Sequence, residues 1–391
     1  MKKPLFSRAG RLAQLFSLTF AVLAAPAAMA SSTVTYDSVA KLAKPVAGEP
    51  VEIKTNYFLA WTGAWDSVIL REKELWKQWL PEGSTVEWKR NLVGPPVVTE
   101  LLAGKQNIGY LGDNPAVAST TKRQLAEVNL VAINAVSPGR LCGNLMVSAK
   151  APQFANPQET LKWLEGKTVG APKGSCAERL ALEVSKRSGV TFKMRALAPE
   201  VVITSLQAGK VDAAMIFEPY ASKAVVDGVA RFGLSAGHFG EFDANGVVMR
   251  RDFIDAHPEA AVAWLKADIQ AMLFLRDYPI ESIEIIKKEL PEYSKENLWF
   301  ALYGALPAET GAKPEGMSGA FAFTPTVNDL ITRIAGFLHD SRLTQQADLP
   351  EGAVKPELVE RALKELGLDP ATALFTFNGS NDNPFKGDEL K

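Results

Sequence analysis

The sequence predicts an α/β protein built from two similar lobes. Residues 97–113 match residues 202–218 at a fixed offset of 105, without a gap, and both copies contain Ala-Gly-Lys, at 103–105 and 208–210. In each copy an apolar i, i+4 pair marks one face of a helix, the glycine ends that helix, and a short apolar strand follows. Chance similarity of two amphipathic helix–strand pairs is the alternative. One unit used in each half of the chain favours two facing lobes.

Each copy of the repeat ends on an acidic residue near a proline. Asp113 precedes Asn114-Pro115, and Glu218 precedes Pro219. The repeat therefore predicts that Asp113 and Glu218 occupy opposed positions at the mouth of one cleft. Two roles are open for these acids: they cap helices and close the lobes, or they contact an amino or hydroxyl group of a ligand.

Strands and helices alternate through the first part of the chain. A strand is predicted over 51–58, where apolar and polar residues alternate, and a helix over 64–80, where the large apolar residues recur at helical spacing. Further strands are expected over 85–88, 107–111 and 128–136, with helices over 96–103 and from 114 onward. Alternating units of this length favour a mostly parallel sheet with helices on its faces.

Ser137-Pro138-Gly139 interrupts this alternation and is the expected first crossover, and a strand over 246–250 is the expected return. The second lobe should hold strands over 145–147, 168–170, 192–194, 211–217 and 229–234, with helices over 177–188 and 199–208. Beyond Asp252 the chain is predicted to be nearly all helical. The expected organisation is a signal peptide over 1–30, lobe I over 31–138, lobe II over 139–245, a mostly helical return to lobe I over 246–345, and a C-terminal helix with a flexible tail over 346–391.

Residues 1–30 have the features of a secretory signal peptide. Four basic residues precede an apolar stretch over 12–25, and Ala28-Met29-Ala30 supplies the small-x-small pattern of a cleavage site near Ala30/Ser31. No later apolar run approaches the roughly 20 residues that a membrane span needs. The sequence therefore predicts an exported protein of the bacterial periplasm.

Net charge, chain length and cysteine count limit the expected partners and the number of lobes. Without residues 1–30 the chain keeps 39 basic and 44 acidic residues, a net charge of −5, so no nucleic-acid partner is expected. A small anion is not excluded, since such sites use local dipoles. About 360 residues exceed one ordinary core, which again favours two lobes. Cys142 and Cys176 are too few for a metal cluster, and whether they form a disulfide stays open.

Four predicted strand-to-helix junctions carry groups that can hold a small anion. Taken alone, each is explained by ordinary helix-start signals, because proline in the first turn and Ser, Thr or Asn before it are common there. Taken together, free backbone N–H groups and hydroxyls around one cleft predict a seat for an oxyanion. The junctions are Ala60-Trp61-Thr62-Gly63, Gly94-Pro95-Pro96, Gly112-Asp113-Asn114-Pro115 and Lys173-Gly174-Ser175-Cys176.

These junctions belong to a series of motifs in a fixed order between residues 50 and 260. The others are Val51-Glu-Ile, Val86-Glu-Trp, Ala103-Gly104-Lys105, Leu164-Glu-Gly-Lys-Thr-Val-Gly, Leu197-Ala198-Pro199 and Phe217-Glu218-Pro219-Tyr220. In this order they resemble the sulfonate/nitrate/taurine family of ABC-transporter substrate-binding proteins. The resemblance implies a type II periplasmic binding protein fold, in which two α/β lobes joined by two crossover strands, with a helical C-terminal region, close on a small ligand.

Two motifs depart from the family's pattern. Glu218 stands where members often have the shorter Asp, and Asp113-Asn114 replaces a Glu-Ala pair. Both changes alter pocket volume and hydrogen-bond partners, so the family's familiar ligands do not carry over directly.

The resemblance places the ligand-lining loops on five segments. Two residues outside these segments are added. Arg140, at the predicted first crossover, is expected to clamp a sulfonate or sulfate with two hydrogen bonds, and His238, in Ala236-Gly237-His238-Phe239, is expected to act as a donor. A solvated loop arginine and a surface or packing histidine are the alternatives. Trp61, Phe217 and Tyr220 are expected to line the organic part of the ligand. The five segments are Trp61-Thr62, Gly94-Pro95, Asp113-Asn114, Gly174-Ser175 and Glu218.

The predicted function is the periplasmic solute-binding component of an ABC importer for a small organosulfur anion, either a sulfonate or a sulfate ester. The alternative is the same receptor type for nitrate, bicarbonate, taurine or a thiamine-precursor pyrimidine. The expected partners are the anion and an inner-membrane ABC permease with its ATPase, and the chain is expected to be a monomer. No enzyme activity, cofactor or metal is predicted. A related fold serves a pyrimidine synthase of thiamine metabolism, but its cysteine-rich cluster is absent here, and the three histidines suit no catalytic constellation.

Overall fold

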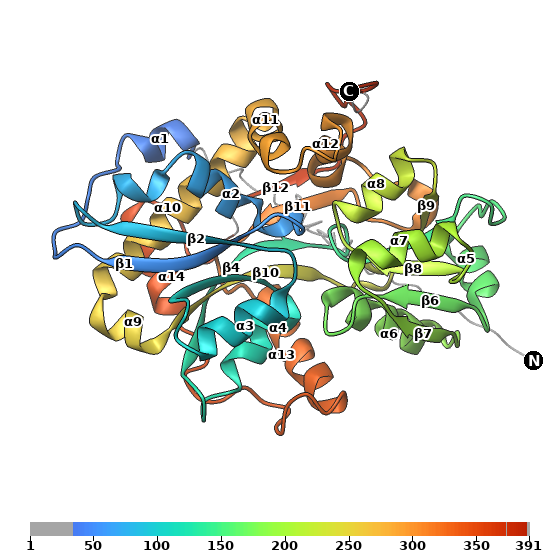
Figure 1. Cartoon of the computed structure of the whole chain (residues 1–391), viewed down its shortest axis with the longest axis horizontal. Coiled ribbons are helices and arrows are strands. Elements are labelled where there is room, and N and C mark those ends of the chain that lie inside the picture. The colour runs from blue at the N-terminus through green and yellow to red at the C-terminus, as the bar shows by residue number, and fades with distance from the viewer. Residues whose placement is uncertain (1–33, 373, 389–391) are drawn as a thin grey trace, which may run out of the picture. The chain divides into compact units, whose positions relative to one another are not determined.

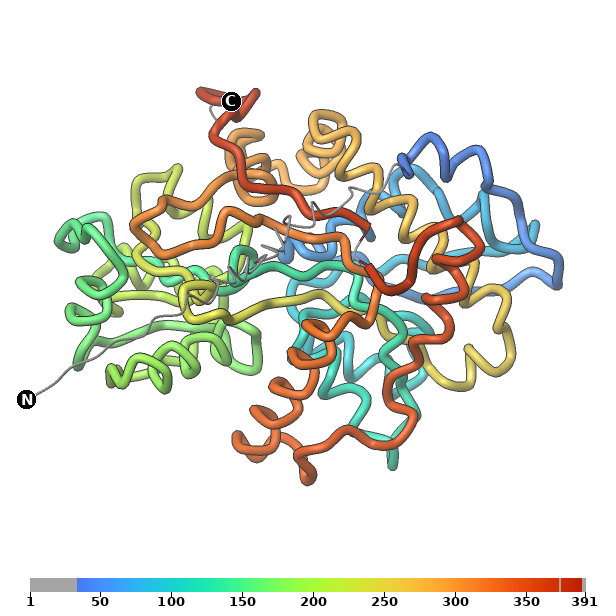
Figure 2. Tube along the Cα trace, turned by 180° about the vertical axis from the view of Figure 1, so that it is seen from behind, coloured from blue at the N-terminus to red at the C-terminus, as the bar shows by residue number. Residues whose placement is uncertain are grey.

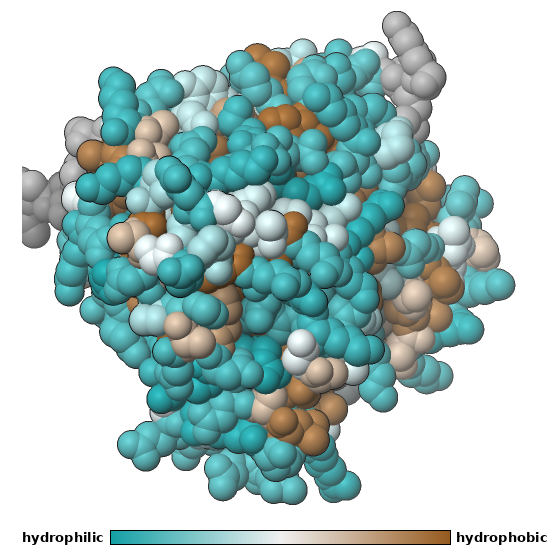
Figure 3. Space-filling model, turned by 60° about the vertical axis from the view of Figure 1, so that its left-hand side comes forward, coloured by the Kyte–Doolittle hydropathy of each residue, from teal (hydrophilic) through white to brown (hydrophobic). Residues whose placement is uncertain are grey.

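The computed structural model describes residues 34–372 and 374–388. The predicted signal peptide, residues 1–30, lies outside these described residues, so its cleavage stays a prediction. Within the described part of the chain, no helix has the length and apolar character needed to cross a membrane. The face drawn in Figure 3 is mainly hydrophilic with small, separated hydrophobic patches, as is ordinary for protein surfaces.

The first and last parts of the chain form a two-stranded and a five-stranded sheet. The side chain of Asn56 joins them: its amide donates to Tyr110 O at 3.0 Å and its oxygen accepts from Tyr110 N at 2.8 Å. In the smaller sheet, β1 (Glu52–Phe58) runs parallel to β2 (Thr85–Asn91). The larger has the order β12-β11-β4-β10-β3, from β3 (Ile108–Gly112), β4 (Val128–Ser137), β10 (Asp243–Arg250), β11 (Glu315–Gly319) and β12 (Phe375–Asn378).

The middle of the chain forms a second five-stranded sheet. The chain enters it after β4 and leaves it before β10, and these two strands lie side by side, antiparallel (Figure 2). Two crossings, over 138–143 and 236–242, therefore connect the five-stranded sheets. The order of the second sheet is β7-β6-β8-β5-β9, from β5 (Asn144–Ser148), β6 (Thr168–Ala171), β7 (Lys193–Ala196), β8 (Ala213–Ile216) and β9 (Ala230–Ser235).

Helices connect the strands and form most of the C-terminal half. Their starts follow ordinary capping chemistry, because the side chains of Asn156, Ser175, Ser294 and Thr324 each accept a hydrogen bond from the backbone N–H three residues on. The α-helices are α1 (Tyr36–Ala40), α2 (Trp65–Glu72), α3 (Gly94–Leu102), α4 (Asp113–Thr120), α5 (Pro157–Leu164), α6 (Cys176–Ser188), α7 (Pro199–Gln207), α8 (Tyr220–Val226), α9 (Arg251–Ala256), α10 (Pro258–Asp277), α11 (Pro279–Glu289), α12 (Lys295–Tyr303), α13 (Pro325–Asp340) and α14 (Pro356–Glu365). Short 3₁₀ helices are η1 (Thr62–Ala64), η2 (Leu75–Gln78), η3 (Ala236–Phe239) and η4 (Ala308–Thr310).

Both faces of the second sheet are buried by helices. Leu145 and Met215 belong to the same core as the apolar residues of α5 and α6, whereas Met146 and Ile216 pack with residues of α7 and α8. Figure 1 shows α6 on one side of this sheet and α7 and α8 on the other. Successive side chains of a strand point to opposite faces, so near-continuous apolar strands are the sequence signature of this arrangement. The α/β class is confirmed.

The repeat is confirmed element by element. Helices α3 and α7 start 105 residues apart, as do strands β3 and β8. Each helix ends on a glycine in the left-handed region, Gly104 with φ 70° and Gly209 with φ 68°. The N–H of each glycine donates to the carbonyl three residues before it at 3.1 Å. The same backbone turn is therefore built twice.

The repeat extends to the side chains that hold each unit in its sheet. Asn107 accepts from Lys54 N and donates its own N–H to Lys54 O, both at 2.8 Å. At the matching position, Asp212 makes the same pair of bonds with Thr168, both at 2.9 Å. Asn and Asp both supply a side-chain oxygen here, which is why the two residue types are interchangeable between the copies.

The sheets are mixed, and the expectation of a mostly parallel sheet is wrong. Strand β5 runs antiparallel to β8 and β9, and β10 runs antiparallel to β3 and β4. The parallel pairs are β1 with β2 and β6 with β7 and β8. Strand β11 also runs antiparallel to β4 and to β12. A strand that enters or leaves a lobe at a crossing need not follow a βαβ crossover.

Two further segments differ from the predicted elements. The helix expected over 64–80 breaks at Glu74, whose φ of 49° is left-handed, and beyond the break the Trp79 indole N–H donates to Gln270 of α10 at 2.7 Å. The region beyond Asp252 also contains β11 and β12, which are short and include glycine, so their sequence signal is weak. The predicted flexible tail makes defined bonds, such as Ser380 N to Tyr303 O at 2.8 Å.

The two glycines that end the repeat helices provide a test of this geometry. Gly104→Ala and Gly209→Ala should each lower the free energy of unfolding by about 1–2 kcal/mol, because a Cβ disfavours the left-handed region. Gly336 lies within α13 with no atom within 4 Å of an added Cβ, so Gly336→Ala should raise the free energy by about 0.5–1 kcal/mol. Urea denaturation measures all three. If Gly104→Ala and Gly209→Ala leave the free energy of unfolding unchanged, the left-handed turn at these two glycines is contradicted.

Candidate ligand-binding site

A cavity lies where the loops of the two sheet systems meet. Its volume is about 60 Å³. Because each side supplies about half of the walls, the cavity has this form only while the two sides are together. Phe58, Trp61, Val93, Gly94, Pro95, Gly112 and Pro115 line it from the side that precedes β4. Pro172, Lys173, Gly174, Ser175, Cys176 and Phe217 line it from the second sheet.

Three helices begin at the wall of this cavity. The residues before their first turns are Val93 for α3, Gly112 for α4 and Ser175 for α6, and all three line the cavity. Val93 and Gly112 offer no side-chain cap, whereas the Ser175 hydroxyl accepts from Glu178 N at 3.3 Å. Backbone N–H groups and helix dipoles at such ends favour anions.

Aromatic rings form the apolar part of the wall. Trp61 and Phe217 come from opposite sides of the cavity and meet edge to face, with ring centroids 6.0 Å apart. Tyr220 is not among the lining residues; it packs behind Phe217 at 5.6 Å and donates its hydroxyl hydrogen to Glu200. The expected aromatic wall is therefore present, with Tyr220 supporting it from outside.

Thr62 carries a buried hydroxyl beside the cavity. Its side chain is 1% exposed, and its Oγ1 has no hydrogen-bond partner among the described residues. The backbone N–H of Thr62 donates to Glu218 O at 3.4 Å, so the residue stands where the two sides of the cavity meet. A buried hydroxyl without a partner costs free energy, which marks this atom as a candidate donor to a ligand.

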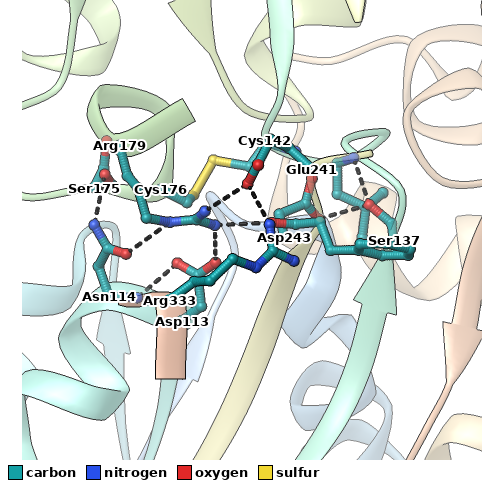
Figure 4. A network of polar contacts seen from close by, with 12 residues as sticks. Asp113, Asn114, Ser137, Cys142, Ser175, Cys176, Arg179, Glu241, Asp243 and Arg333 are labelled. Atoms are coloured by element: carbon teal, nitrogen blue, oxygen red, sulfur yellow. Dashed lines mark hydrogen bonds and ion pairs between the residues drawn. A yellow bond between two sulfur atoms is a disulfide. The ribbon is translucent and has the colours of Figure 1, made fainter. Parts of the chain in front are cut away.

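Asp113 is neutralised by Arg179, which comes from the other side of the cavity (Figure 4). Arg179 Nη2 lies 2.7 Å from Asp113 Oδ2, and the side chains of Arg179 and Asp113 are 2% and 0% exposed. Arg179 Nε also donates to Asn114 Oδ1 at 3.1 Å, and the Asn114 amide donates to Ser175 O at 3.1 Å. These bonds join the start of α4 to the start of α6.

The Arg179 guanidinium also contacts the second crossing. Nη2 donates to Phe242 O at 2.8 Å, and Nη1 lies 3.5 Å from Glu241 Oε2. Glu241 also pairs with Arg333 of α13 at 2.9 Å and with Arg187 of α6 at 2.5 Å. Arg179 thus links both sides of the cavity to one crossing.

A disulfide ties the first crossing to the same helix. Cys142 and Cys176 are bonded, with Cα atoms 6.1 Å apart, which settles the question that the sequence left open. Asp243 accepts from Cys142 N at 2.8 Å and from the Ser137 hydroxyl at 2.6 Å. Burial raises the pKa of Asp243 to about 7. The N-terminus of α6 is therefore fixed to both crossings.

Glu218, the second acid of the repeat, is also held by an arginine. Arg140 Nη1 lies 2.7 Å from Glu218 Oε1, while its Nε and Nη2 donate to Gly304 O and Phe300 O at 3.1 and 2.5 Å. The second Glu218 oxygen accepts from Ser222 N at 2.8 Å. Burial raises the pKa of the Glu218 carboxyl, and Arg140 opposes this effect. A ligand could reach the Arg140 guanidinium only by displacing one of these partners.

Of the predicted site residues, Trp61, Gly94, Pro95, Gly174 and Ser175 line the cavity. Thr62, Asp113, Asn114, Arg140 and Glu218 lie in the contacts between the two sides rather than on the wall. His238, in η3, packs against Phe239 and Gly311. Within the described part of the chain, no cluster of side chains suits a metal ion.

Arg179, which binds Asp113, Asn114 and the second crossing, was not predicted from the sequence. Its signal was present: Cys176, Arg179, Leu180 and Val184 follow helical spacing, which puts the arginine on the buried face of α6. A buried arginine needs an acidic partner. The partner itself could not be read from the chain, because Asp113 lies 66 residues away.

The two five-stranded sheets and the two crossings between them define a two-lobed α/β fold of the type II periplasmic binding protein kind. Residues 187–285 match the model of the NMT1-like family. The taurine-binding periplasmic protein of Escherichia coli (strain K12) is 26% identical over 193 residues, which are 48% of this chain and 57% of that protein.

Two solved structures are similar over most of the chain. The alkanesulfonate-binding protein SsuA from Xanthomonas axonopodis pv. citri, bound to MOPS, is 20% identical with a TM-score of 0.62, over 79% of this chain and 100% of that one. The periplasmic nitrate-binding protein NrtA from Synechocystis PCC 6803 is 16% identical with a TM-score of 0.63, over 85% and 97%.

These comparisons confirm the predicted fold and the resemblance to the sulfonate, taurine and nitrate-binding proteins. The sequence match spans little more than half the length of the taurine-binding relative, 57% of it. At identities of 20% and 16% the structural likenesses concern the fold alone.

The buried ion pair of Arg179 with Asp113 predicts that substituting Arg179 has a large effect on stability. Arg179→Met should lower the free energy of unfolding by about 3–5 kcal/mol, because it leaves the buried Asp113 carboxylate without a cation. Arg195 is exposed, and Arg195→Met should change stability by less than about 0.5 kcal/mol. Urea denaturation of both variants measures the difference, and equal stabilities would show that the buried pair adds nothing.

Proposed function

We propose that the protein is the periplasmic solute-binding component of an ABC importer for a small organosulfur anion, a sulfonate or a sulfate ester. The observation that carries the proposal is the meeting of three helix N-termini on one cavity that has aromatic walls. Similarity to taurine-, alkanesulfonate- and nitrate-binding proteins supports the class of ligand.

In this proposal the anionic head is held by neutral donors. The start of α3 offers the N–H of Gly94, since Pro95 and Pro96 have none, and the start of α4 offers that of Asp113, since Asn114 N donates to Asp113 Oδ1 at 2.6 Å and Pro115 has no N–H. Thr62 supplies a hydroxyl that has no partner among the described residues. Because Asp113 and Glu218 are both paired with arginines, neither presents an unbalanced negative charge to the anion. Lys173, exposed at the rim, adds a positive charge where the anion enters.

The organic part of the ligand would contact the rings and prolines of the wall. Trp61 and Phe217 approach each other from opposite sides, and Pro95, Pro115 and Pro172 add further apolar surface. Apolar walls with a few placed polar groups are typical of small-molecule sites. This composition favours an anion with a carbon skeleton over inorganic nitrate.

Ligand binding would be coupled to closure of the two lobes. The walls come from both sides, so opening about the two crossings would separate the donors of α3 and α4 from those of α6. The closed form would then be recognised by a membrane permease and its ATPase, as expected from the sequence. A monomer, no enzyme activity and periplasmic export after signal-peptide cleavage complete the proposal.

A panel of anions tests the class of ligand. Taurine, ethanesulfonate, toluenesulfonate, a sulfate ester and nitrate are each added to the purified protein, and thermal unfolding is followed. A ligand at 100 times its dissociation constant should stabilise the fold by about 2.7 kcal/mol. Stabilisation by a sulfonate or sulfate ester is expected. Stabilisation by nitrate or a pyrimidine alone would overturn the ligand class, and turnover of any compound would favour an enzyme.

The Thr62 hydroxyl allows a second test. Thr62→Val removes a hydroxyl without a partner, so the ligand-free protein should keep its stability while the affinity for the best panel anion falls by about 1.5–3 kcal/mol, the value of a hydrogen bond to a charged group. Thr160 is the matched control, because its buried hydroxyl donates to Gly233 O at 2.9 Å, away from the cavity. Thr160→Val should lower stability and leave affinity unchanged. Calorimetric titration and urea denaturation separate the two effects.

A further inference from the structure

Two carboxyl groups lie buried together behind the cavity wall. Asp66, in the first turn of α2, and Asp268, within α10, are both 0% exposed. Their side chains interact with each other, and neither forms an ion pair with a basic residue in the described part of the chain. A buried acid pair without a cation is costly, and the function described above does not use it.

A row of hydrogen bonds leads from the cavity to this pair. The Trp61 indole N–H donates to Asn245 Oδ1 at 3.1 Å, and the Asn245 amide donates to Asn134 Oδ1 at 2.7 Å. The Asn134 amide in turn donates to Asp66 Oδ2. Asn134 belongs to β4 and Asn245 to β10, the two strands that carry the chain into and out of the second sheet.

The row has one direction, because every donor points toward Asp66. A carboxylate at the end of such a row strengthens the last bond, since hydrogen bonds to ionised groups are roughly twice as strong as neutral ones. Each amide that donates more strongly also accepts more strongly, so the gain passes along the row. The charge of Asp66 therefore strengthens the hydrogen bond that Trp61 donates to Asn245.

The titratable groups around the pair decide when Asp66 is charged. Burial raises the pKa of Asp66 to about 7, and burial together with the charge of Asp66 also raises the pKa of Asp268. Tyr110 of β3 faces the pair, and burial raises its pKa as well. Asp66 accepts hydrogen bonds on both oxygens, from Ser67 N at 2.9 Å and from the Asn134 amide, whereas neither oxygen of Asp268 has a hydrogen-bond partner among the described residues. These donors favour Asp66 as the member of the pair that carries the charge.

Charged groups on the surrounding helices are engaged elsewhere. On α2, Arg71 pairs with Glu72 and with Glu289 of α11. On α10, Lys266 pairs with Glu365 of α14, and Arg276 pairs with Asp277. The acid pair thus responds to solvent pH without a nearby compensating cation.

We propose that Asp66 is a positioning residue for Trp61: an ionised Asp66 holds the tryptophan against the cavity through Asn134 and Asn245. Protonation of Asp66 weakens the row and loosens Trp61. The proposal rests on the proposed function only where it concerns affinity, since the position of Trp61 can be measured without ligand.

The test follows the indole N–H signal of Trp61 by NMR in the ligand-free protein. The chain has eight tryptophans, and Trp61→Phe identifies the signal by its loss. As pH rises from 5.5 to 8.5, the Trp61 indole proton should move downfield with a midpoint near 7, because its hydrogen bond strengthens. Trp163, in α5 of the second sheet region, is the internal control and should not move.

Two matched substitutions separate the roles of the acids. Asp66→Asn removes the charge at the end of the row, so the Trp61 signal should stay at its low-pH position throughout. Asp268→Asn removes the second carboxyl and leaves the row from Trp61 to Asp66 intact, so a titration of the Trp61 signal should remain. An unmoved Trp61 signal in the unsubstituted protein, or a titration lost in Asp268→Asn and kept in Asp66→Asn, would overturn the proposal.

A binding measurement adds the functional consequence. Toluenesulfonate should bind the unsubstituted protein roughly twofold to fivefold more tightly at pH 8 than at pH 6, since each bond of the row gains only a modest increment. Asp66→Asn should remove this dependence. If toluenesulfonate does not bind at any pH, the proposed ligand class fails while the indole titration still decides the positioning role.

Discussion

The arrangement of this protein depends on burying two carboxylates, one from each copy of the repeat, at the place where the lobes meet. Asp113 and Glu218 have side chains that are 0% exposed, and each is matched by an arginine from outside its own repeat unit. Such a pair adds little net stability over apolar residues, but losing one member leaves a buried charge that is expensive. The two pairs therefore act mainly as constraints on how the lobes fit together.

For the proposed function, this constraint limits how an anion would be bound. Arg140 and Arg179 have partners on all three guanidinium nitrogens, so neither is free to act as the main clamp. The donors that remain near the cavity are backbone N–H groups at the starts of α3, α4 and α6, which Pro95, Pro96 and Pro115 reduce in number, the Thr62 hydroxyl beside the wall and the rim lysine. Neutral, fixed donors select by position rather than by net charge. A rigid oxyanion carried on an apolar group suits such a site.

How far the sequence predicts the structure follows from the range of each interaction. The repeat was recognisable because Gly104 and Gly209 stop a helix through local backbone geometry, and the helices and strands follow short-range periodicity. The cavity residues Trp61, Gly94, Pro95, Gly174 and Ser175 were found because loop motifs resemble a family. The partners of Asp113 and Glu218 were missed, since Arg179 and Arg140 lie 66 and 78 residues away along the chain, and no local pattern encodes such pairing.

The crossings unite these features. The adjoining strands β4 and β10 contribute Asn134 and Asn245 behind Trp61, and the first crossing contributes Cys142, bonded to the start of α6, and Arg140, bonded to Glu218. A rotation of one lobe against the other would have to move about these same residues, so the wall of the cavity and the axis of closure share their side chains. A ligand that binds only when both walls are present shifts the equilibrium by its affinity for the closed form. Asp113–Arg179 and Asn114–Ser175 already join the lobes, so in the proposed closure the protein itself would supply part of the free energy and the ligand the remainder.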